Sequence, residues 1–143
     1  MKIFLADDDE DDRMFFVDAL KEIPTSTDIT EFTNGVELMD RLLTDDKLPD
    51  VIFLDLKMPL MDGFECLADI RDVDKLTKIP VVIYSTSFHK EEVTRLQETG
   101  ATRYLKKPSS YNQLKTLLHN CLNNLHAFSH VEDKGDNNFI IDE

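Results

Sequence analysis

The stretch that decides the fold reads V-I-F-L-D-L-K-M-P-L-M-D-G and runs from Val51 to Gly63. Its four leading apolar residues are followed directly by a carboxylate, Asp55. An apolar run this short, closed by a turn with proline and glycine, favours a strand buried on both faces over a helix. Asp55 then stands at the carboxyl end of that strand, where open α/β sheets bind ligands. Position alone fits a site carboxylate and a helix cap equally well.

Length and charge limit the classes of protein to which the chain can belong. Its 143 residues, 41% of them hydrophobic, suffice for one ordinary core and predict a single domain. A formal net charge of -13 opposes binding to nucleic acid or anionic lipid. Because no apolar run approaches a secretory signal or the roughly 20 residues of a membrane span, we expect a cytoplasmic protein with no membrane partner. Cys66 and Cys121 lack metal-ligand spacing and are predicted to be buried, reduced thiols.

Short β-like runs alternate with helical patterns along the chain. Strands are expected at residues 2–6, 28–32, 51–54, 81–84 and 102–106, and helices at about 11–22, 36–43, 62–73, 90–98 and 111–126. Five β-α units predict an α/β fold with a doubly wound, five-stranded parallel sheet and helices on both faces, because right-handed crossovers place them there. We expect the flavodoxin-like strand order 2-1-3-4-5, which puts the first and third strands side by side.

That strand order brings two acidic loops together. The first strand is followed by the acidic run from Asp7 to Asp12, whose last three members are explained by the dipole of the helix that they begin. Asp7 and Asp8, however, would crowd Asp55. Three carboxylates this close repel one another unless a cation is bound, and an all-oxygen site suits Mg²⁺. An EF-hand loop is a disfavoured alternative, because Asp12 stands where its sixth position requires glycine.

Two further strand ends contribute hydroxyls and a cation. Ser85, Thr86 and Ser87 follow the fourth strand and can donate to an anion, although turns favour such residues too. Lys107 follows the fifth strand and can supply a positive charge to a phosphate. Carboxylates, Mg²⁺, a hydroxyl and a lysine on one rim fit phosphoryl transfer onto a carboxylate, with Asp55 as the nucleophile.

In combination, these motifs resemble the receiver domain of two-component response regulators, over residues from about Lys2 to His126. The motifs that match are Asp7-Asp8 after the first strand, D-L-K-M-P-L-M-D-G from Asp55 to Gly63, Ser85 after the fourth strand, and Lys107-Pro108. The resemblance implies that Asp55 is the phosphoacceptor and that Lys107 pairs with the phosphoryl group. It further implies that Asp8, Asp55 and the backbone carbonyl of Lys57 bind Mg²⁺, with Asp7 helping through water.

The resemblance also implies a conformational switch. Ser85, or Thr86 if the alignment slips by one residue, would swing toward the phosphate while Tyr104 turns inward. The output surface would consist of the fourth helix, fifth strand and fifth helix, with Lys57 and Ser87 at positions that tune dephosphorylation. The Lys107-Pro108 peptide bond would be cis. Such a protein is not a dedicated enzyme, but it catalyses its own phosphorylation and dephosphorylation.

The implied partners are a sensor histidine kinase or phosphotransfer protein and a downstream protein, and dimer formation stays open. The connection from Asp72 to Pro80 resembles that of stand-alone receivers that serve phytochrome-type kinases. We expect a receiver domain at residues 1–126 and an acidic C-terminal tail at 127–143, with no output domain. In that tail Phe139, Ile140 and Ile141 could dock on the domain or on a partner, but a disordered end is the favoured interpretation.

Two alternative functions fit the sequence less well. A receiver-shaped interaction module that acts without phosphorylation would not need the acidic pair and Lys107. A haloacid-dehalogenase-type phosphohydrolase would require an Asp two residues after the nucleophile, where Lys57 stands. The four histidines are not needed for the chemistry, and a metal site on His126 and His130 at i,i+4 spacing is disfavoured. The histidines are His89, His119, His126 and His130.

Overall fold

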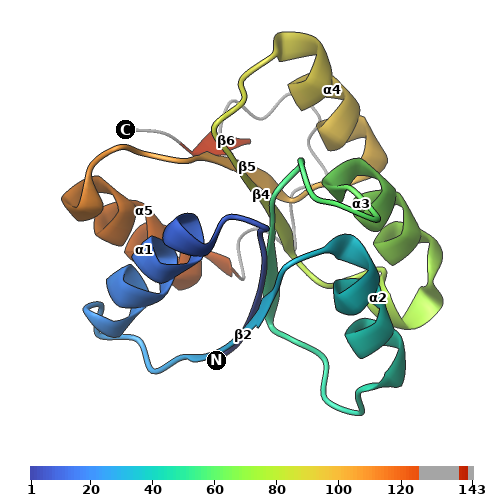
Figure 1. Ribbon diagram of the computed structural model, residues 1–143, viewed down its shortest axis with the longest axis horizontal. Helices are drawn as coiled ribbons and strands as arrows, with labels where there is room; N and C mark the ends of the chain where they lie inside the picture. Colours follow the sequence, from blue (N-terminus) through green and yellow to red (C-terminus); the bar gives the residue numbers. More distant parts are fainter. Residues whose placement is uncertain (126–138, 142–143) are drawn as a thin grey trace.

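The computed structural model describes residues 1–125 and 139–141 (Figure 1). In chain order, the elements are β1 (Lys2–Ala6), α1 (Glu10–Lys21), β2 (Asp28–Phe32), α2 (Gly35–Thr44), β3 (Val51–Leu54), α3 (Gly63–Asp72), the 3-10 turn η1 (Asp74–Leu76), β4 (Val81–Ser85), α4 (Lys90–Thr99), β5 (Arg103–Lys106), α5 (Tyr111–Asn123) and β6 (Ile140–Ile141). All strands are parallel, in the order β2-β1-β3-β4-β5-β6. The predicted flavodoxin-like topology is therefore confirmed.

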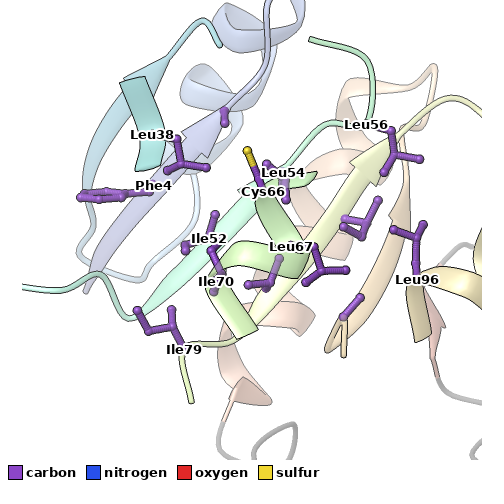
Figure 2. Close-up of a cluster of buried hydrophobic side chains, with 14 of the residues drawn as sticks. Phe4, Leu38, Ile52, Leu54, Leu56, Cys66, Leu67, Ile70, Ile79 and Leu96 are labelled. Carbon is purple, nitrogen blue, oxygen red and sulfur yellow. The ribbon is translucent and has the colours of Figure 1, made fainter. Parts of the chain in front are cut away.

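Helices cover both faces of the sheet. Helices α1 and α5 lie together on one face, and α2, α3 and α4 lie on the other (Figure 1). Because successive side chains of a strand point to opposite faces, each central strand feeds both layers of the core. On the second face, Cys66 and Leu67 of α3 pack close to Ile52 and Leu54 of β3 (Figure 2). Both cysteines are free and buried, as predicted, and burial raises the pKa of the Cys66 thiol to about 12.

The start of α3 is held close to the end of β3. Asp62 caps this helix by accepting from the backbone N–H of Glu65, whose side chain accepts from the N–H of Asp62. Gly63 follows this cap, and a Cβ atom added there would lie 2.3 Å from the carbonyl oxygen of Asp55. Only glycine permits this close approach. The local sequence D-G therefore brings α3 against the strand end that carries the central carboxylate.

Several details differ from the sequence predictions. The sheet has a sixth strand, β6, so the favoured interpretation of a disordered end is wrong for Phe139 to Ile141, where Phe139 is buried. The apolar residues 139–141 pair with the edge strand β5 of the sheet. This pairing is a contact between distant parts of the chain, so the local sequence pattern does not predict it. Helix α5 ends at Asn123 rather than near His126, and the connection after α3 contains η1.

The peptide bond between Lys107 and Pro108 is trans, as is every peptide bond in the described ranges. This corrects the cis form implied by the family resemblance. For an X-Pro bond the trans form is intrinsically favoured by roughly 0.5–1 kcal/mol. The histidine pair His126 and His130 lies outside the described residues. Within residues 1–125 and 139–141, no helix has the length and apolar character needed to cross a membrane.

Candidate phosphoacceptor site

The ends of β1 and β3 place three carboxylates together. Backbone pairing runs past both strand ends: the N–H of Asp55 donates to Ala6 (2.9 Å), and that of Asp7 donates to Phe32 (3.0 Å). Asp7 is fully buried and Asp55 is 8% exposed, whereas Asp8 is open to solvent. One carboxylate oxygen from each of Asp7, Asp8 and Asp55 lies within 4.8 Å of the other two. The predicted meeting of the two acidic loops therefore occurs.

This donor set fits a hard divalent cation. Mg²⁺ prefers oxygen ligands and keeps several of its waters, so it requires carboxylates beside an open space. Asp8 and Lys57 line such a space, a shallow groove of about 520 Å³ that also borders Asp62 and Phe64. Asp8 opens onto this groove, and one carboxylate oxygen from each of Asp7 and Asp55 lies within 4.8 Å of one from Asp8. The three carboxylates would therefore hold the ion while leaving room for its waters.

Lys107 is the cation that the chain itself supplies to these acids. Its Nζ lies 2.7 Å from Asp7 Oδ2, 2.8 Å from Asp12 Oδ2 and 3.3 Å from Asp55 Oδ2. The Lys107 side chain is only 7% exposed. Its backbone N–H donates to the carbonyl oxygen of Ser85 (2.9 Å), which fixes the end of β5 against that of β4. One buried ammonium group thus forms ion pairs with three carboxylates.

Burial and charge set the protonation of the site. Burial raises the pKa of Asp55 to about 6, and the charge of Asp7 adds to this, while Lys107 opposes it. The N–H of Leu56 also donates to Asp55 Oδ1 (2.8 Å), which favours the ionised form. Burial by itself would lower the pKa of Lys107, but hydrogen bonds to Asp12 and Asp7 hold that pKa above its usual range. Asp55 is therefore mostly ionised at neutral pH, beside a permanently charged lysine.

The hydroxyl and aromatic groups named for the switch lie beside this site. Ser85 is 2% exposed at the end of β4 and its Oγ accepts from the N–H of Ser87 (3.2 Å), whereas Thr86 is exposed. Tyr104 is 1% exposed, so its ring lies inward, and its hydroxyl donates to the carbonyl oxygen of Ser87. The ring of Phe88 packs edge-on to that of Tyr104, with centroids 6.3 Å apart.

Asp12 is a member of the site that the sequence analysis did not single out. The dipole of the helix that it begins is enough to explain its charge in the sequence, yet its carboxylate contacts Lys107 at 2.8 Å. The orientation follows from the start of α1, where the Asp9 side chain accepts from the backbone N–H of Asp12 (3.1 Å). The only signal for this role in the sequence is the position of Asp12 in the acidic run. That signal does not distinguish Asp12 from Asp11 as a partner of Lys107.

We expect Asp12→Asn to weaken Mg²⁺ binding by about two- to five-fold, equivalent to a surface ion pair of about 0.5–1 kcal/mol. Without Asp12, Lys107 would pair only with Asp7 and Asp55 and compete more strongly with the cation. Asp11→Asn is the matched control, because it removes the same charge from an exposed carboxylate that is not one of the three that Lys107 contacts. Calorimetric titration of both variants measures the difference. Equal affinities would show that only net charge matters.

The fold and the acidic rim together define a protein of the receiver class, in which a carboxylate at the end of the third strand is flanked by two acids and a lysine. Comparison with known proteins agrees: the chain belongs to the response regulator receiver domain family, whose model matches residues 3–119.

Individual relatives cover most of the chain. It is 30% identical over 122 residues to a chemotaxis protein CheY homolog of Campylobacter jejuni, covering 85% of this chain and 92% of that one. It is 33% identical over 116 residues to the sensor histidine kinase CheAY of Helicobacter pylori, covering 81% of this chain but only 14% of that one. Among solved structures, the phosphorylated cyanobacterial phytochrome response regulator RcpA superposes with a TM-score of 0.80 at 28% identity, covering 88% of this chain and 94% of that one.

Proposed function

We propose that the chain is a phosphorylatable switch of a two-component system, in which Asp55 accepts a phosphoryl group from a phosphohistidine. The observation that carries this proposal is the contact of Lys107 with Asp55 and Asp7 within a cluster of three carboxylates. Burying carboxylates of like charge lowers the stability of the fold. A protein that only binds other proteins would not need this cluster, so its presence favours phosphoryl transfer.

The proposed transfer needs no general base. An ionised oxygen of Asp55 attacks the phosphorus, a P–O bond forms, and the P–N bond of the donor breaks. The other ring nitrogen of the phosphohistidine carries a proton in the reacting form, so the electron pair of that bond leaves with a neutral imidazole. Lys107 would neutralise charge on the transferring group, and the Ser85 hydroxyl would donate to it. Asp7, Asp8, Asp55 and the backbone carbonyl of Lys57 would hold Mg²⁺, which supplies further neutralisation of the phosphoryl oxygens when bound.

The switch follows from contacts that only the phosphorylated state can make. A phosphoryl group on Asp55 would attract the Ser85 hydroxyl, and this would favour the inward position of Tyr104 beside it. Because Tyr104 lies on β5, between α4 and α5 in the chain, the α4-β5-α5 surface would report the state of Asp55 to a downstream protein.

A histidine kinase or a phosphotransfer protein is the proposed donor. One relative of the chain is itself a sensor histidine kinase, and one structural neighbour is a phytochrome response regulator. Together with the connection at residues 72–80, which contains η1, this similarity supports a kinase of the phytochrome class as the donor. The high negative charge argues against nucleic acid as a direct partner.

Incubation with Mg²⁺ and acetyl phosphate, followed by intact-mass measurement, tests the function. In this reaction the P–O bond of the donor breaks and acetate leaves. We expect one base-labile phosphoryl adduct on the wild type, none on Asp55→Asn, and an undiminished adduct on Asp46→Asn, which neutralises an exposed carboxylate away from the site. A wild type without an adduct, or an Asp55→Asn variant with one, would contradict the proposal. The first outcome would favour an interaction module that acts without phosphorylation.

A further inference from the structure

The tail segment from Phe139 to Ile141 completes the sheet at the outer edge of β5. Strand β6 lies beside β5, on the side away from β4 (Figure 1). Tyr104 is in register with Ile140, and Leu105 is in register with Ile141. The backbone N–H of Tyr104 donates to the carbonyl oxygen of Phe139 at 2.9 Å. The residue proposed as the aromatic switch is therefore hydrogen-bonded directly to the tail.

Side chains of the tail segment also join the core. Phe139 is 5% exposed and belongs to the same hydrophobic cluster as Tyr104, on the face covered by α2, α3 and α4. Ile140 packs against that cluster, and Ile141 packs against the cluster on the face of α1 and α5. The tail segment thus contacts β5 through its backbone and both layers of the core through its side chains.

Strand β6 covers the edge of β5 at Tyr104, the residue proposed as the aromatic switch. Without β6, β5 would be the edge strand, and the ring of Tyr104 could leave the core toward that edge. In the structure the inward ring is enclosed by Phe88 and by the cluster that contains Phe139. A ring turned outward, toward the β5 edge, would have to compete for space with the tail segment paired there, because core packing leaves few voids.

We propose that the tail segment is a docking strand whose attachment to β5 is coupled to the inward state of Tyr104, and through it to phosphorylation of Asp55. The coupling to phosphorylation of Asp55 rests on the proposed function, whereas docking of the tail segment does not. The occupant of the β5 edge is the tail of the same chain. Docking of the tail segment stabilises the inward position of the Tyr104 ring. If phosphorylation of Asp55 also stabilises that position, it strengthens docking.

Thermodynamic linkage makes this coupling reciprocal and measurable. If docking and phosphorylation favour the same position of Tyr104, each must strengthen the other by the same factor. Couplings of this kind typically amount to about five-fold or more. The exchange rate of the backbone amide of Tyr104 reports docking, because this N–H donates to Phe139 and becomes accessible when the strand detaches.

Amide hydrogen exchange in the full chain tests docking first, without phosphorylation. Phe139→Ser should accelerate exchange at Tyr104 by at least about five-fold, because the buried aromatic anchor is lost. Leu43→Ser is the matched control, since it makes a comparable change at a half-exposed site on α2. Unchanged exchange at Tyr104 in Phe139→Ser would overturn docking, whatever the fate of the proposed function.

The same measurement with Mg²⁺ and acetyl phosphate then tests the coupling. Exchange of the Tyr104 amide, which donates to Phe139, should slow by about five-fold in the wild type and stay unchanged in Asp55→Asn. Intact mass of the same sample separates the outcomes. An adduct without slower exchange overturns the coupling and leaves the proposed function standing, whereas no adduct overturns both. Protection that rises with protein concentration, together with a dimer in solution, would assign the β5 edge to the tail of a second copy and overturn docking within one chain.

Discussion

Lys107→Ala should lower the free energy of unfolding by about 3–5 kcal/mol in metal-free buffer near pH 7, the range found when one partner of a buried ion pair is removed. The Lys107 side chain is 7% exposed, and its ammonium group lies within 3.3 Å of three carboxylates. Without it, Asp7 and Asp55 would face each other with no compensating charge from the protein. Denaturant unfolding of the variant and the wild type measures the difference.

A neighbouring lysine provides the control for this prediction. Lys106→Ala removes the same charge from an exposed side chain whose ammonium group lies 5.8 Å from the centre of the Phe88 ring. We expect it to change stability by less than about 1 kcal/mol. Mg²⁺ should stabilise Lys107→Ala more than the wild type, because no ammonium group competes for the carboxylates. Equal losses in the two variants, or equal stabilisation by Mg²⁺, would contradict the role given to Lys107.

Asp55→Asn should abolish the phosphoryl adduct and, in metal-free buffer at pH 7, raise the free energy of unfolding by roughly 2–3 kcal/mol. Asp55 is 8% exposed, and its burial raises its pKa from 3.8 to about 6. The ionised carboxylate therefore costs folding free energy that an uncharged amide of similar size does not. Asp46→Asn again serves as the control, with an expected change near zero. A less stable Asp55→Asn variant would mean that the contact with Lys107 outweighs the cost of burial.

The pH dependence of this gain follows from the direction of the shift. Because the pKa of Asp55 is higher in the folded state than in the unfolded chain, the folded state binds more protons between about pH 4 and pH 6. The contribution of Asp55 to stability therefore falls as the pH rises through this window. The gain from Asp55→Asn should be full above about pH 6.5 and small near pH 4. If the increase in the free energy of unfolding of Asp55→Asn does not depend on pH, burial of the ionised Asp55 carboxylate is not its cause.

The order of strands and helices could be predicted because each element has a local signal. The apolar run before Asp55 marks a buried strand, and Asp62-Gly63 marks the start of the next helix. Gly100 ends α4 in the left-handed conformation that favours glycine, with φ of 114°. These signals act over a few residues, so no tertiary contact is needed to detect them. The parallel topology then follows from the handedness of crossovers.

The candidate site could be predicted in part for the same reason. Asp7, Asp55, Ser85 and Lys107 each follow a strand directly, and parallel strands of one sheet end at a common edge. Asp12 was missed because its role depends on which face of α1 turns toward β5. The bond to Pro108 was expected to be cis from resemblance alone, and the structure has it trans.

By itself, then, the sequence determined the doubly wound sheet and the carboxylates and lysine at its edge, because strand ends and turns are encoded locally. Only the tertiary structure decided which acids share Lys107, that Tyr104 lies inward, and that Phe139 to Ile141 close the edge of β5. These features depend on contacts between residues 16 to 100 positions apart, from Phe88 and Tyr104 to Asp7 and Lys107. Their formation requires loop closure and burial rather than local preference. Asp55 thus has a position set by its own strand and an environment set by the rest of the fold.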